Sequence, residues 1–110
     1  MKIFITIFAI LLMTSGVVFA DDMDDVPDYI LEDIKDRAAQ KYPDSYSMQQ
    51  FKIKQEAKAY LAIQNYSNDS IPYDILDSII EKAAEKYPDS YSMQKFKIDM
   101  EVKAYIKINS

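Results

Sequence analysis

The chain has 110 residues, with no cysteine, no histidine and a single glycine, and its 18 acidic and 13 basic residues give a net charge of −5. Without histidine, the chain lacks the usual general base near neutral pH and the nitrogen ligands of zinc. Without cysteine, it lacks a thiolate nucleophile, disulfide bonds and the sulfur ligands of zinc. A single glycine excludes glycine-rich phosphate loops. The acidic balance also argues against binding to nucleic acid.

The first twenty residues have the three parts of a signal peptide. Lys2 provides a positive start, residues 3–13 are apolar except for Thr6, and Ala20 is a small residue suited to cleavage. We therefore predict a signal peptide over residues 1–20 and a secreted or periplasmic protein. The alternative is an uncleaved membrane anchor, because residues 3–20 come close to the length of about twenty that a span needs. Polar residues weaken the end of this run and no basic cluster follows, so we expect no membrane association after cleavage.

An acidic segment follows over residues 21–26, with aspartates at positions 21, 22, 24 and 25. A calcium loop needs spaced ligands and a glycine, and this run has neither. We predict a disordered terminus and no metal site. Lys2 is the only charged residue of the leader, so its removal changes the net charge from −5 to −6. That charge would favour a basic protein as partner.

An internal repeat with a period of 45 residues organises the rest of the chain. Residues 27–65 and 72–110 are identical at 23 of 39 positions, and residues 41–49 recur unchanged as 86–94. A polar linker, residues 66–71, separates the copies. Duplicated units of this length are typical of helical-repeat architectures.

The first segment of each copy has the pattern of an amphipathic helix. Asp25 and Ser70 stand just ahead, each with a proline two positions on, and we expect them to be the N-caps. The apolar residues at helical spacing are Ile30, Leu31, Ile34, Ala38 and Tyr42, and again Ile75, Leu76, Ile79, Ala83 and Tyr87.

A tight turn follows in each copy, because Pro43 and Pro88 disfavour helical geometry in the preceding tyrosine. The Asp-Ser pairs that end at Ser45 and Ser90 can cap the next helix.

The second segment is ambiguous, because residues 96–104 alternate apolar and polar residues as a strand does. The equivalent residues 51–59 are rich in good helix formers. Copies this similar should share a fold, so we predict a helix in both. On a helical wheel this helix has two apolar faces, one with Met93, Phe96, Met100, Ala104 and Ile108, and the other with Tyr91, Ile98, Val102, Tyr105 and Ile106.

The predicted fold is therefore all-α, with two tandem helical hairpins that pack as a small four-helix bundle. A helix that is apolar on two sides must be covered on two sides, either inside such a bundle or by another chain.

Only a pair of carboxylates remains as possible catalytic equipment, and Glu56 and Glu101 are equivalent candidates. Short hairpin loops leave little room for a cleft, and surface charges paired with nearby lysines are the simpler interpretation. We predict a protein that is not an enzyme, with no catalytic residue and no cofactor.

The repeated turn supplies the candidate binding residues, Tyr46 and Met48 with their equivalents Tyr91 and Met93. Aromatic and methionine side chains are typical interface anchors, although the simpler interpretation is that they lock each hairpin by packing its two helices together. We expect an exported, non-catalytic, acidic helical-repeat module that binds a protein partner or forms a homodimer. The alternative function is a small-ligand or glycan binder that uses the repeated tyrosines.

Overall fold

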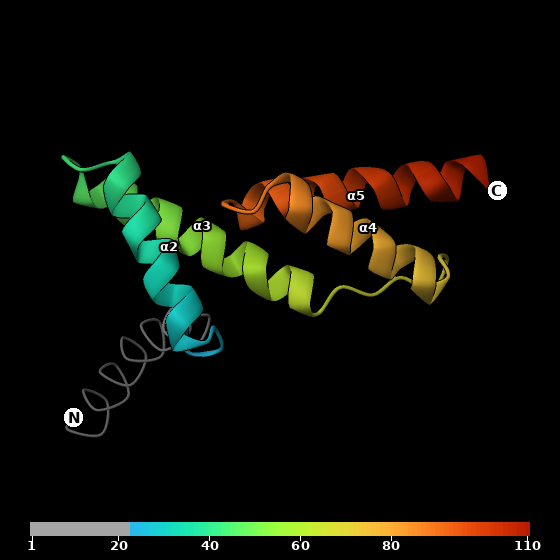
Figure 1. Cartoon of the computed structure of the whole chain (residues 1–110), viewed down its shortest axis with the longest axis horizontal. Helices are drawn as coiled ribbons and strands as arrows, with labels where there is room; N and C mark the ends of the chain where they lie inside the picture. Colours follow the sequence, from blue (N-terminus) through green and yellow to red (C-terminus); the bar gives the residue numbers. More distant parts are fainter. Residues whose placement is uncertain (1–22) are drawn as a thin grey trace, which may run out of the picture.

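A computed structural model of the chain describes residues 23–110, which form four α-helices and no strand (Figure 1). The helices are α2 (Asp28–Lys41), α3 (Tyr46–Gln64), α4 (Tyr73–Lys86) and α5 (Tyr91–Ile108). The all-helical prediction is confirmed, including the helix over the alternating residues 96–104. The predicted signal peptide lies outside the described residues. Within the described range, no helix combines the length and the apolar character needed to cross a membrane.

The helices pair as two hairpins that are joined through their longer members. α2 packs on α3, α4 packs on α5, and the main contact between the hairpins is that of α3 with α5 (Figure 1). The four helices thus pack together in the spatial order α2, α3, α5, α4. α3 and α5 run in the same direction, since Glu56 lies at Tyr91 and Ile63 shares a core with Ile98.

The two turns between helices are held by the same side chains in both copies. Ser45 and Ser90 are the N-caps of α3 and α5, and each hydroxyl accepts a hydrogen bond of 3.2 Å from the N–H three residues on. The side-chain amides of Gln49 and Gln94 donate at 2.8 Å to the carbonyls of Tyr42 and Tyr87, the C-cap residues of the preceding helices. The predicted caps of these helices are confirmed.

The predicted caps of α2 and α4 are wrong. Pro27 and Pro72 are the N-cap residues, and neither helix has a side-chain cap. The proline ring fixes φ at −55° and −60°, and ψ near 145° lets each proline carbonyl accept the first helical hydrogen bond. Asp25 and Ser70 are therefore too far from the helix start to reach its amides.

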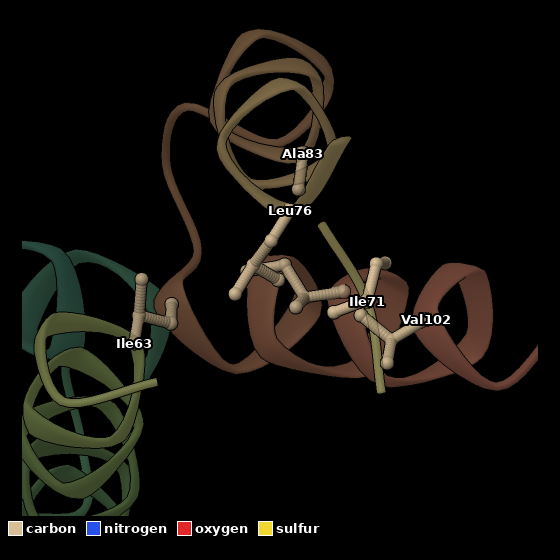
Figure 2. Close-up of a cluster of buried hydrophobic side chains, with 6 residues drawn as sticks. Ile63, Ile71, Leu76, Ala83 and Val102 are labelled. Atoms are coloured by element: carbon tan, nitrogen blue, oxygen red, sulfur yellow. The ribbon is translucent and has the colours of Figure 1, made fainter. Parts of the chain in front are cut away.

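Two clusters of apolar side chains form the core, and each hairpin contributes to the cluster of the other. The cluster of the second hairpin contains Ile98 and Val102 from α5, Leu76 and Ala83 from α4, Ile71 from the linker and Ile63 from α3 (Figure 2). The cluster of the first hairpin contains Val26, Ile34 and Ala57, and Tyr91 of α5 packs against it. Burial of apolar surface therefore stabilises the junction as well as each hairpin.

Residues 23–26, the described part of the predicted acidic terminus, lie directly ahead of α2. The Val26 N–H donates to the Met23 carbonyl at 3.1 Å, which closes a turn. Val26 is buried beside Ile34, and its counterpart Ile71 is buried in the second hairpin. The apolar residue before each Pro, absent from the predicted stripe, therefore belongs to the core.

Candidate interaction surface

α5 buries one of its two predicted apolar faces. Ile98 and Val102 are buried, whereas the opposite face is exposed along its length. Phe96 is 58% exposed and its counterpart Phe51 on α3 is 62% exposed. The exposed residues form a row of methionine and phenylalanine side chains, called here the Met-Phe row: Met48 and Phe51 on α3, and Met93, Phe96 and Met100 on α5.

The C-terminal half of this face is covered on α3 and bare on α5. Ala59 and Ile63 are buried against the second hairpin, with Ile63 7% exposed. Their equivalents Ala104 and Ile108 are exposed, with Ile108 at 80%. Equivalent residues thus lie in the interface between the hairpins on α3 and on the surface on α5.

Glu56 is the polar centre of the junction between the hairpins. Its carboxylate is buried and accepts hydrogen bonds from the Tyr91 N–H at 2.7 Å and from the Ser92 N–H at 3.2 Å. Lys52 lies 3.3 Å from the same carboxylate. Together with the Ser90 hydroxyl, Glu56 satisfies the amides of the first turn of α5, where the helix dipole also favours a negative charge.

An aromatic pair flanks this carboxylate. The rings of Tyr60 on α3 and Tyr91 on α5 have centroids 5.1 Å apart and meet edge to face at 80°. Burial raises the pKa of the Tyr91 hydroxyl above its usual value. Arg37 adds a rim contact, 3.5 Å from the Asp89 carboxylate, which contributes little because the Asp89 side chain is 85% exposed.

The sequence interpretation of the two glutamates is right for one and wrong for the other. Glu101 is an exposed charge that pairs with Lys97 at 3.3 Å, as expected. Glu56 also pairs with a lysine, but it is 5% exposed and caps a helix of the other hairpin. The repeat itself contains no signal for this difference, since both glutamates have the same neighbours at i−4, i+3 and i+4.

The four predicted binding residues lie in different surroundings. Tyr46 is 86% exposed at the start of α3, whereas Tyr91 is half-buried in the junction. Met48 and Met93 are partly exposed members of the Met-Phe row. The structure brings Met93 to the same open groove as Phe51, between the hairpins, but places Tyr46 and Tyr91 on different hairpins.

The chemistry available at this surface is packing and hydrogen bonding. Among residues 23–110, no three acidic side chains converge in a way that could hold a metal ion. Comparison with protein-family models, with curated proteins and with solved structures finds no match to this chain.

Proposed function

We propose that the protein is an exported, non-catalytic interaction module that binds a protein partner through the Met-Phe row. The observation that carries this proposal is the exposure of the row on both long helices. Exposed phenylalanine and methionine side chains on both long helices favour a partner surface, because burial of their apolar area against a partner is favourable. Methionine adapts its shape to different partners, and aromatic rings supply large contact areas.

The groove between the hairpins supports a partner segment with an apolar anchor. Phe51 and Met93 line it as apolar contacts, and its charged lining is mixed, with Asp33, Asp36 and Asp89 beside Arg37, Lys41 and Lys52. A segment with an apolar side chain flanked by charges of both signs would match this lining. The net charge of −6 for the chain without its leader favours a basic protein as the partner.

The alternative function, glycan or small-ligand binding by the repeated tyrosines, has less support. The ring of Tyr91 packs against Tyr60, so it is not available as a stacking platform. Tyr46 is exposed and lines a shallow hollow with Met23 and Ile53, and it is the remaining candidate for a sugar contact. A sugar-binding activity that disappears in Tyr46→Ala with unchanged helicity would favour this alternative.

The Met-Phe row is tested by capture of partners with a double variant, Phe51→Ser with Phe96→Ser. Tagged protein is incubated with the exported fraction of its native source, and bound proteins are identified by mass spectrometry. We expect the wild-type chain to retain a basic protein that the double variant loses, with unchanged helicity by circular dichroism.

The control for this experiment is Tyr73→Ser, which removes an exposed aromatic ring outside the row. It should retain the partner as well as the wild-type chain does. Equal capture by all three proteins, or a chain that retains nothing, would contradict the proposal.

A further inference from the structure

Each hairpin carries two complementary surfaces, and the junction inside the chain uses one from each. The first hairpin contributes the face of α3 that contains Glu56, Ala59, Tyr60 and Ile63. The second contributes the start of α5, where the Tyr91 and Ser92 amides meet the Glu56 carboxylate. We call these the glutamate face and the turn end. The glutamate face of α5 and the turn end of α3 have no such partner within residues 23–110.

We propose that chains of this protein associate head to tail by repeating the internal junction between molecules. The glutamate face of α5 in one chain binds the turn end of α3 in the next chain. Glu101 then accepts hydrogen bonds from the Tyr46 and Ser47 amides, as Glu56 does from those of Tyr91 and Ser92. This inference rests on the proposed interaction function, and it names a second copy of the chain as one partner.

Both surfaces are repeated with nearly the same residues. The turn end is identical, since residues 41–49 recur unchanged as 86–94. The glutamate face keeps Glu101, Ala104, Tyr105 and Ile108, and Lys97 lies 3.3 Å from Glu101 as Lys52 lies from Glu56. The central residues of the internal junction therefore have counterparts on the two unused surfaces, which can form the same contact between two chains.

Both unused surfaces are accessible. Tyr46 is 86% exposed and Ile108 is 80% exposed, whereas Tyr91 is half-buried and Ile63 is buried in the junction. Ser45 satisfies one amide of the first turn of α3, and no acceptor meets the Tyr46 or Ser47 amide in the described part of the chain. The junction leaves no such amides exposed on α5.

A hollow marks the place where the next chain would bind. It is lined by Tyr46, Ser47, Gln49, Gln50 and Ile53 of α3, by Lys35 of α2 and by Met23. On the second hairpin the equivalents of Tyr46 and Ile53 are Tyr91 and Ile98, which contact the first hairpin at the junction. The hollow is therefore the site that Ile108 of a second chain would fill, as Ile63 packs with the core around Ile98.

The rim of the interface differs between the copies. Lys82 stands where the first hairpin has Arg37, and Ser78 stands where it has Asp33. The contact of Arg37 with Asp89 is replaced by a lysine near Asp44, which retains the charge and loses the planar guanidinium. The junction between chains also lacks the linker, so it pays the entropy of association that the internal junction avoids.

The symmetry of this contact makes the association open-ended. The two surfaces differ from each other, so the contact is heterologous and leaves one unused surface at each end of every assembly. Such contacts form filaments, or rings when the rotation closes, and do not stop at a two-fold dimer. The assembly state therefore distinguishes this contact from a symmetric dimer on the Met-Phe row.

Thiol crosslinking tests the contact directly, because the chain contains no cysteine. The variant Ser47→Cys with Lys97→Cys, which keeps the Glu101 carboxylate and places a thiol beside it, is treated with a short bismaleimide and analysed by denaturing electrophoresis. We expect a ladder of linked chains. Each single variant should remain unlinked, and a mixture of the two single variants should stop at one linked pair.

Two matched variants calibrate this experiment. Lys52→Cys with Ser92→Cys places two thiols in the groove at the internal junction, keeps Glu56, and should link within one chain. Ser47→Cys with Lys103→Cys moves one thiol to another exposed position of α5 and should give no ladder. An internal pair that reacts while Ser47→Cys with Lys97→Cys yields single chains at about 1 mM protein, a concentration that detects weak binding, overturns the proposal.

Sedimentation of the unmodified protein decides the question independently of the crosslinking reaction. We expect the average mass of the wild-type chain to rise beyond two chains with concentration. Glu101→Ala should weaken the association about tenfold, since it removes hydrogen bonds to a charged group. A monomer at every concentration contradicts the head-to-tail contact and leaves the Met-Phe row to its own test. A dimer that is insensitive to Glu101→Ala but is lost with Phe51→Ser and Phe96→Ser would also contradict the head-to-tail contact, because it would form through the Met-Phe row.

Discussion

The two hairpins have nearly the same sequence and differ chiefly in what covers them. Glu56 is buried and caps a helix, whereas Glu101 is exposed. At the start of the long helices the order is reversed, because Tyr91 is half-buried and Tyr46 is exposed. Each hairpin therefore has one surface in use and one unused.

This comparison shows that a residue's role here depends on the neighbouring hairpin and not on its place in the repeat. The turn and the capping serine are the same in both copies. The carboxylate that meets the first amides is supplied by another hairpin, so it is present at α5 and absent at α3 within the described chain. The same substitution made at equivalent positions of the two hairpins can separate the effect of the local sequence from the effect of packing against the other hairpin.

The largest difference is expected at the central isoleucines. Ile98 is completely buried and Ile53 is half-buried, although they are equivalent in the repeat. We expect Ile98→Ala to lower the free energy of unfolding by about 3 kcal/mol, through lost burial and a cavity. Ile53→Ala should cost clearly less. Urea unfolding of the two variants measures this difference, and equal losses would contradict the unequal coverage of the hairpins.

A smaller difference is expected at the glutamates. Glu56→Ala removes the acceptor of two buried amides and should cost about 2 kcal/mol in stability. Glu101→Ala should change the stability of the monomer by less than about 0.5 kcal/mol, because its side chain is exposed. Both values come from denaturant unfolding at a protein concentration at which the chain is monomeric. Similar losses in both variants would show that the junction at Glu56 is not formed.

Much of this fold could be predicted from local sequence, and the junction could not. Helical spacing, the capping serines and the prolines of the turns act within a few residues, so the turns and helices were predicted with the repeat. The strand-like alternation of residues 96–104 is interpreted as a helix only because the equivalent residues 51–59 of the first copy are rich in helix formers. The burial of Glu56 depends on the packing of α3 against α5, and Glu101 has the same neighbours at i−4, i+3 and i+4 without being buried.

The capping serines should give equal effects and therefore serve as an internal reference. Ser45 and Ser90 accept the same hydrogen bond at the same distance. Replacement of either by alanine should cost about 1 kcal/mol in stability. Thermal or denaturant unfolding of both variants checks this. A much larger loss for Ser90→Ala would indicate that the Glu56 contact depends on the cap.

The smallest effect is expected at high pH, where the linker meets the second hairpin. Tyr66 donates to Asp99 at 3.0 Å, and burial together with this carboxylate raises the pKa of Tyr66 from 10.0 to about 12. Between these values the unfolded chain loses the phenolic proton while the folded chain retains it, so stability falls as pH rises. Tyr66→Phe should reduce that fall. An unchanged slope between pH 10 and 12 would show that the contact with Asp99 does not persist in solution.

The most direct measurement is amide hydrogen exchange at the starts of the two long helices. In the monomer, the Tyr91 and Ser92 amides should exchange slowly because Glu56 accepts from both, and the Tyr46 and Ser47 amides should exchange as fast as exposed backbone. Glu56→Ala should remove the protection at α5 and leave α3 unchanged. Equal exchange at the two helix starts in the wild-type chain would contradict the account.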